Sequence, residues 1–214
     1  MMEIDTIVWD WNGTLLDDID VSIETINVLL ANRNLPLLNK ENYLNVFGFP
    51  VQDYYERIGF NFEEEPFDIP AHEYIEGYAS AVKQASLHAE VRELLKWFNG
   101  QKYRQFILSA SEKNSLEMLI EHYGIKQWFI SVAGLNNHYA QSKEEIGIRL
   151  MKDQRIRPEK TCLIGDTVHD FEVAQAMGCH CILIANGHQS YERLVKTGTT
   201  VLYHLSELKA VLKR

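Results

Sequence analysis

Short runs of apolar residues, each closed by a polar residue or a glycine, recur along this sequence with helical patterns between them. The apolar runs occupy residues 6–9, 106–108, 129–132, 162–164 and 181–184. Apolar residues at helical spacing occupy residues 91–98, 115–123, 142–152 and 170–177. Because strands that alternate with helices form a parallel sheet covered on both faces, the sequence predicts an α/β fold with a three-layer core.

One long segment interrupts this alternation, because we find no convincing strand between residues 14 and 87. Its helical patterns lie at residues 21–31, 41–46, 51–58 and 72–84. A chain of 214 residues is long enough for one large domain that carries a smaller insert. We therefore expect a core domain formed by residues 1–15 and 88–214, and an α-helical cap domain formed by residues 16–87.

Charge and cysteine content exclude several classes of protein. Lys and Arg number 21 against 30 Asp and Glu, and the net charge of −9 is opposite in sign to a nucleic-acid-binding surface. No apolar run approaches the roughly 18 residues of a membrane span, and the acidic N-terminus is unlike a signal peptide. Cys162, Cys179 and Cys181 lack the spacing of a disulfide framework or a zinc site. We expect a cytoplasmic monomer or homodimer with no membrane or nucleic-acid partner.

Polar residues gather where the expected strands end, and the carboxyl ends of parallel strands are where such sheets bind ligands. These residues are Asp10, Asn12 and Thr14, then Ser109, then Lys143, then residues 165–170. Asp10, Asp166 and Asp170 form a group of carboxylates that needs a cation, and oxygen ligands suit Mg²⁺. Because a hydroxyl and an ammonium add donors for a phosphoryl group, the pattern is typical of phosphoryl transfer.

The same residues, taken in order, resemble the four motifs of the haloacid dehalogenase superfamily. The motifs are residues 10–14, Ser109, Lys143 and residues 165–170. The layout is similar to the phosphoglycolate-phosphatase-like branch, which carries a helical cap where this sequence has its insert. The resemblance implies a Rossmann-like parallel-sheet core and Mg²⁺-dependent hydrolysis of a small phosphorylated metabolite through an aspartyl-phosphate.

The resemblance also implies which residues act on phosphorus and which hold the metal. Asp10 is implied as the nucleophile, since a carboxylate can take up a phosphoryl group. Asp166 and Asp170 are implied as Mg²⁺ ligands, together with Asp10 and the backbone carbonyl of Asn12.

The remaining motif residues are implied as partners of the phosphoryl group. Ser109 and Lys143 would bind its oxygens and stabilise their charge. Gly13 would give the backbone the freedom to turn toward the ligand, and Thr14 would orient this loop. We also expect His188, in the loop after the last predicted strand, to approach the substrate.

The sequence departs from the family pattern at Asn12, where most phosphatases of this family have an aspartate that acts as general acid and base. An amide can donate a hydrogen bond but cannot exchange a proton in the useful pH range, and such catalysis is worth roughly 10²–10⁴-fold. We expect slow hydrolysis, best with aryl or acyl phosphates, and a gain in turnover from Asn12→Asp. Alternatively His169, His188 or a cap residue supplies the proton.

Other functions are compatible with parts of the pattern. A non-hydrolytic protein that binds Mg²⁺ and phosphate, or a phosphotransferase, would also use these residues. Dehalogenation is disfavoured because the sequence keeps Asp166 and Asp170 and has no aromatic residue at position 12.

Ser111 is the nearest alternative to Ser109 as the phosphoryl-binding serine. We expect Ser111 instead to cap the helix that follows.

Overall fold

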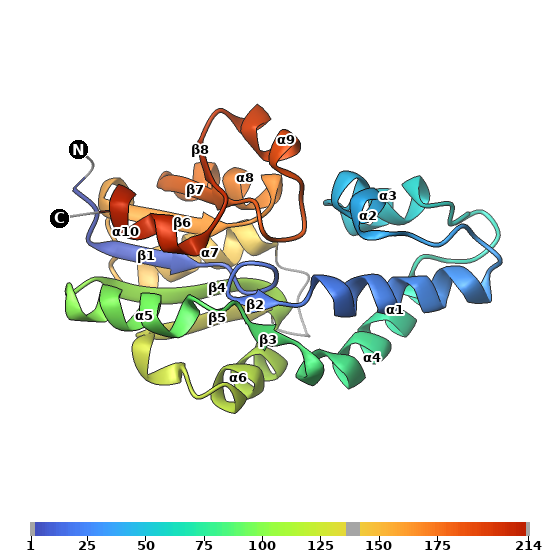
Figure 1. The fold of residues 1–214 in the computed structure, drawn as a ribbon, viewed down its shortest axis with the longest axis horizontal. Helices are drawn as coiled ribbons and strands as arrows, with labels where there is room; N and C mark the ends of the chain where they lie inside the picture. The colour runs from blue at the N-terminus through green and yellow to red at the C-terminus, as the bar shows by residue number, and fades with distance from the viewer. Residues whose placement is uncertain (1–2, 136–141, 213–214) are drawn as a thin grey trace.

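A six-stranded parallel sheet forms the centre of the computed structural model, which describes residues 3–135 and 142–212 (Figure 1). The strand order is β5-β4-β1-β6-β7-β8, and every neighbouring pair is parallel. The strands are β1 (Thr6–Trp9), β4 (Arg104–Glu112), β5 (Ser131–Leu135), β6 (Thr161–Gly165), β7 (His180–Ile184) and β8 (Thr200–Leu202). Because β1 lies between β4 and β6, the residue that follows it stands at the middle of the carboxyl edge.

Helices cover both faces of this sheet. On one face lie α5 (Val91–Gly100), α6 (Lys113–His122) and α10 (Leu208–Val211), and on the other lie α7 (Lys143–Asp153) and α8 (Val168–Met177). Successive residues of β1 alternate between the two layers, since Ile7 and Trp9 pack with α5 and Val8 packs with α7 and α8. The predicted three-layer α/β core is confirmed.

The segment between β1 and α5 is helical. It contains α1 (Ile19–Asn32), α2 (Lys40–Val46), α3 (Val51–Arg57) and α4 (Asp68–Ala81), which extend to one side of the sheet in Figure 1. These helices bury a hydrophobic cluster of their own, with Ile26, Leu30, Tyr43 and Tyr55 among its members. Two short antiparallel strands, β2 (Leu16–Asp17) and β3 (Ser86–Leu87), pair where the chain leaves and rejoins the core. The division into two domains at residues 16 and 87 stays a prediction.

Several elements differ from the sequence-based expectation. The short strands β2, β3 and β8 were not predicted, because two or three residues are too few to show a period. β4 continues to Glu112 rather than ending at Ser109, and β5 begins two residues later than the apolar run at 129. The helix predicted at residues 72–84 ends in a short helical turn, η1 (Val82–Gln84). The described residues also contain short helical turns that we did not predict. They are η2 (Lys126–Trp128), η3 (Pro158–Lys160), α9 (Tyr191–Leu194), η4 (Val195–Thr197) and η5 (Leu205–Glu207).

Across the two described stretches of the chain, no helix has both the length and the apolar content needed to cross a bilayer.

The hydrophobic cluster of α1–α4 yields a stability prediction. Ile26 is fully buried in this cluster, whereas Val28, on the same helix, is 59% exposed. Ile26→Ala should lower the free energy of unfolding by about 2–5 kcal/mol, because it leaves a cavity. Val28→Ala should change it by no more than about 0.5 kcal/mol. Urea unfolding followed by circular dichroism measures both, and equal effects of the two substitutions would contradict the assignment of this core.

Candidate active site

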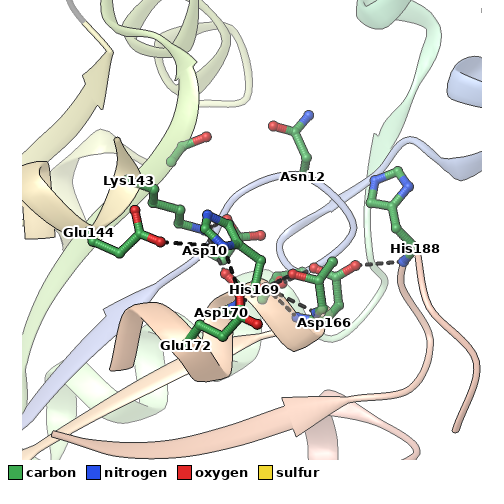
Figure 2. A network of polar contacts seen from close by, with 12 residues as sticks. Asp10, Asn12, Lys143, Glu144, Asp166, His169, Asp170, Glu172 and His188 are labelled. Atoms are coloured by element: carbon green, nitrogen blue, oxygen red, sulfur yellow. Dashed lines mark hydrogen bonds and ion pairs between the residues drawn. The ribbon is translucent and has the colours of Figure 1, made fainter. Parts of the chain in front are cut away.

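Three buried carboxylates meet at the carboxyl edge of the sheet. Asp10 follows β1, Asp166 follows β6, and Asp170 lies in the first turn of α8. One oxygen of each lies within 4.8 Å of the others, and none of the three residues is more than 6% exposed. Figure 2 shows them converging on one point. The structure therefore brings together the carboxylates that the sequence places at separate strand ends.

Hydrogen bonds from neighbouring hydroxyl and backbone N–H groups hold two of these carboxylates in place. Asp166 accepts from the Thr14 hydroxyl at 2.8 Å and from the His188 backbone N–H at 2.5 Å. Asp170 accepts from the Thr167 N–H at 3.0 Å and the Thr167 hydroxyl at 2.6 Å, and Thr167 in turn caps α8. This capping box fixes the first turn of α8, so Asp170 is positioned by the start of its own helix.

Lys143 is the one ammonium seen among the three carboxylates in the described residues. Its Nζ lies 2.5 Å from Asp10 Oδ1 and 2.6 Å from Asp170 Oδ1, and only 5% of its side chain is exposed. Ser142 accepts from the Glu145 N–H and caps α7, which makes Lys143 the first residue of that helix. The helix start therefore delivers the ammonium to the carboxylate edge of the sheet, as expected.

The electrostatics of this group favour a bound cation. Burial raises the pKa of Asp10 to about 6, with repulsion from Asp170 adding to it and Lys143 opposing it. Burial also raises the pKa of Asp166 well above its usual value. Burial opposes ionisation of Asp170 as well, but Lys143 and Thr167 outweigh it and lower the pKa of that carboxyl. Three carboxylates and one ammonium leave two buried negative charges, which one divalent cation with oxygen ligands would balance.

Two glycines allow the surrounding loops to approach Asp166 closely. Gly13 has a φ of 73°, and a Cβ atom there would lie 2.3 Å from Asp166 Oδ2. A Cβ atom at Gly187 would lie 2.2 Å from the same oxygen. Because any side chain would collide with the carboxylate, both positions require glycine.

The two serines of β4 occupy different places from those expected. Ser109 is buried within the strand, and its Oγ accepts from the Ser111 N–H at 3.0 Å. Ser111 does not cap α6, because the Glu112 side chain accepts from the N–H groups of Asn114 and Ser115. The expectation for Ser111 is therefore wrong, and the reason is that β4 runs on past it. The phosphoryl-binding role of Ser109 stays a prediction.

Asn12 is held by groups outside the carboxylate triad. Its Nδ2 donates to Asp18 Oδ2 at 2.9 Å and to the Tyr78 hydroxyl at 2.7 Å. Its Oδ1 accepts from the Ser111 hydroxyl at 2.8 Å. In Figure 2 the amide points away from Asp10, Asp166 and Asp170. The side chain thus makes a full set of polar contacts beside the triad rather than within it.

Asp18 is the main residue of this site that sequence reasoning missed. It is 1% exposed and accepts from the Gly13 N–H at 2.8 Å and the Tyr78 hydroxyl at 2.5 Å. Burial would raise its pKa, but the nearby His188 and the hydrogen bonds lower it. In sequence, an aspartate just before a helix is typical of a cap. Asp18 stands at that position of α1, yet its side chain makes no capping hydrogen bond.

His188 joins the core loop to the helical insert. Its Nε2 lies 3.2 Å from Asp18 Oδ1, and its Nδ1 lies 2.9 Å from the Tyr43 hydroxyl of α2. Burial lowers its pKa, but the Asp18 carboxylate outweighs burial and raises the pKa to about 9. The ring also lies 5.1 Å from Phe47, measured between centroids. The His188 ring thus contacts Asp18, Tyr43 and Phe47. The expected contact of His188 with substrate stays a prediction.

His169 lies on the rim of the site, on α8. Its Nδ1 is 3.3 Å from Glu172 and 3.6 Å from Glu144 (Figure 2). The ring of Phe49, from the insert, lies 4.6 Å from the His169 ring between centroids, at an interplanar angle of 30°. With Phe47 against His188, the loop between α2 and α3 therefore places an aromatic ring on each of the two site histidines.

Comparison with known proteins identifies the family. The family model described as haloacid dehalogenase-like hydrolase matches residues 7–184. The chain therefore belongs to this family, and the resemblance read from its motifs is confirmed.

Individual relatives are more distant. Tyrosine-protein kinase PtkA of Mycobacterium tuberculosis is 23% identical over 212 residues, which cover 96% of this chain and 72% of that protein. Phosphoglycolate phosphatase of Photobacterium profundum is 26% identical over 133 residues, covering 61% of this chain and 58% of the relative. Among solved structures, the haloacid dehalogenase-like hydrolase SP0104 of Streptococcus pneumoniae matches with a TM-score of 0.85 at 18% identity, over 100% of both chains. That likeness shows the shared fold.

The buried charge of the triad predicts stabilisation by a divalent cation. At a Mg²⁺ concentration of about 100 times Kd, the free energy of unfolding should rise by about 2.7 kcal/mol near pH 7.5. The gain should shrink at pH 5, where protons compete for Asp10 and Asp166. Without the cation, the raised pKa of Asp10 means that its contribution to stability is lost as the pH rises from about 4 through 6.

Thermal unfolding with and without Mg²⁺ measures this effect. Asp166→Asn should abolish the rise in Tm, whereas Asp153→Asn, which changes an exposed carboxylate at the end of α7, should leave it intact. An equal rise in Tm for Asp166→Asn and the unchanged protein would contradict a metal site at the triad.

Proposed function

We propose that this haloacid dehalogenase-like hydrolase is a Mg²⁺-dependent phosphatase that acts on a small phosphorylated metabolite through an aspartyl-phosphate on Asp10. The observation that carries the proposal is the buried Asp10 carboxylate, 2.5 Å from the Lys143 ammonium and grouped with Asp166 and Asp170. A carboxylate kept close to a fixed ammonium, at a point where a cation fits, is equipped to attack an anionic phosphoryl group. The name of the phosphoglycolate phosphatase relative supports a small phosphate ester as substrate.

In the first step an oxygen of Asp10 attacks phosphorus, and the bond from phosphorus to the ester oxygen breaks. The ester oxygen leaves with the electron pair, and the phosphoryl group becomes bonded to Asp10. Lys143, fixed at the start of α7, offsets negative charge as the phosphoryl group approaches. Mg²⁺, held by Asp10, Asp166, Asp170 and the Asn12 carbonyl, would supply further neutralisation of the phosphoryl oxygens.

In the second step a water oxygen attacks phosphorus, the bond to Asp10 breaks, and inorganic phosphate leaves. The attacking water must give up a proton, and the free Asp10 carboxylate must be restored. Asn12 cannot accept that proton. We therefore propose that the second step is slow, and that the first step proceeds best when the leaving oxygen needs no proton.

Phosphotransfer to a hydroxyl is the second candidate function, and two observations favour it. The relative that matches over 96% of this chain is named a tyrosine-protein kinase. Asn12 also leaves the attacking water without the base that most family phosphatases provide at this position. An acceptor hydroxyl that brings its own base, or is deprotonated by a buried group, would then compete with water for the aspartyl-phosphate.

Removal of the nucleophile tests the proposal. Asp10→Asn should reduce p-nitrophenyl phosphate turnover in Mg²⁺ by at least about 10³-fold, because the amide cannot form the covalent intermediate. A chelator should have a comparable effect on the unchanged protein. Asp153→Asn serves as the control, since it alters an exposed carboxylate far along α7. Turnover that persists in Asp10→Asn would exclude the mechanism.

The slow second step predicts a burst. In rapid mixing with p-nitrophenyl phosphate, about one equivalent of p-nitrophenol per chain should appear before steady turnover begins. Acid quenching during this phase should trap phosphate on Asp10, located by peptide mapping. If an added hydroxyl compound becomes phosphorylated and speeds steady turnover, transfer is favoured over hydrolysis. Release of p-nitrophenol and inorganic phosphate at equal rates from the start of the reaction would contradict a slow second step.

A further inference from the structure

We propose that Asp18 is a positioning residue whose carboxylate requires an amide at position 12. The carboxyl group of the pair then stands at position 18, and position 12, where hydrolysis would use a proton-exchanging group, carries an amide. In this view Asn12 and Asp18 form a matched amide–carboxylate pair. Restoring an aspartate at position 12 then requires the opposite change at position 18. The catalytic part of this inference rests on the proposed function above, whereas the pairing itself rests on the contacts alone.

The contacts of Asn12 define which end of its side chain faces Asp18. An ionised carboxylate only accepts hydrogen bonds, so the group 2.9 Å from Asp18 Oδ2 must be the amide nitrogen. The Ser111 hydroxyl donates to the amide oxygen from the other side at 2.8 Å. The amide therefore meets an acceptor on one side and a donor on the other, and asparagine alone among close isosteres of aspartate supplies both.

The hydrogen-bond donors around Asp18 are already engaged with its carboxylate and are not free for a second carboxylate beside it. Its two oxygens already accept from the Gly13 N–H, the Tyr78 hydroxyl and the Asn12 amide, and His188 lies 3.2 Å away. The residue is 1% exposed. These donors come from the loop after β1, from α4 and from the loop after β7, so Asp18 is held from three directions.

A carboxylate introduced at position 12 alone would therefore face another carboxylate about 2.9 Å away in a buried site. Two like charges at this distance repel, and the hydrogen bonds that the Asn12 nitrogen donates to Asp18 and to the Tyr78 hydroxyl would be lost. On this proposal Asn12→Asp alone would not raise turnover, which differs from the expectation based on the sequence.

The exchange of both residues removes the conflict. In Asn12→Asp/Asp18→Asn, the new amide at 18 would donate to the new carboxylate at 12, and Ser111 would still donate to it. The Tyr78 hydroxyl, which accepts from Asn12 and donates to Asp18 in the unchanged protein, would reverse both roles. The number of charges in the cluster is unchanged, so His188 keeps a carboxylate nearby. Position 12 then carries a group that can take a proton from water and give one to a leaving oxygen.

Unfolding measurements test the pairing without reference to activity. We expect Asn12→Asp and Asp18→Asn each to destabilise the protein, and the double variant to recover at least tenfold in the folding equilibrium constant, or about 1.4 kcal/mol. Asp17→Asn is the matched control, because Asp17 adjoins Asp18 but is exposed on β2. Combined with Asn12→Asp, it should give additive effects. Additive effects for Asp18→Asn as well would overturn the proposal.

Turnover measurements test the catalytic consequence. The double variant should release phosphate from both an alkyl phosphate and p-nitrophenyl phosphate at least about tenfold faster than the unchanged protein. The alkyl ester gains because its leaving oxygen now receives a proton, and both esters gain because the slow second step acquires a base. Asn12→Asp alone should show no such gain. A full gain from Asn12→Asp alone would overturn the role of Asp18.

The two experiments separate this inference from the proposed function. If none of the variants traps phosphate on Asp10, the proposed function fails, while the unfolding cycle still decides whether residues 12 and 18 are paired. If the unchanged protein traps phosphate and the double variant gains no turnover on the alkyl ester, the proposed function stands and the catalytic role of the pair is overturned.

Discussion

The buried contact between Lys143 and the carboxylates of Asp10 and Asp170 is the constraint on which the site depends. Each of these groups would be costly to bury alone, and a single ammonium does not balance three carboxylates. The sheet edge therefore holds excess negative charge that only protons or a cation can relieve. In a protein of net charge −9, a bound divalent cation would neutralise this local excess and so remove the repulsion that an anionic phosphate would otherwise meet.

The helical insert is attached to this centre through the loop between α2 and α3. Arg193 donates to the carbonyls of Leu44 and Phe47, and Gln189 donates to Phe47, so core side chains bind the end of α2 through its backbone. The side chain of Phe47 meanwhile lies against His188. Because the insert contacts the core through the same loop that surrounds the site, its movement would change access to Asp10 and the environment of His188 together.

The carboxyl edge of the sheet was predictable from sequence because each strand there is an apolar run of several residues closed by a polar one. Asp10, Asp166 and Lys143 follow such runs, and parallel strands must place their ends together. Asp18 was not predictable in this way. Its position before a helix is that of an ordinary cap, and its partners Tyr78 and His188 lie 60 and 170 residues away along the chain. Only the folded structure shows that Asp18 is buried and that its carboxylate contacts both Tyr78 and His188.

The fate of one proton connects Asn12 to the choice between hydrolysis and transfer. In the proposed mechanism both reactions would share the aspartyl-phosphate, and they would differ in the oxygen that attacks it and in the group that takes the proton of that oxygen. Water is abundant but needs a base beside it, whereas an acceptor hydroxyl can be positioned by binding. An amide at position 12 would slow attack by water more than attack by a bound acceptor hydroxyl. For the bound acceptor, the orientation provided by binding partly replaces base catalysis. An amide fixed by Asp18 would therefore lengthen the life of the intermediate and favour an acceptor that the insert can hold in place.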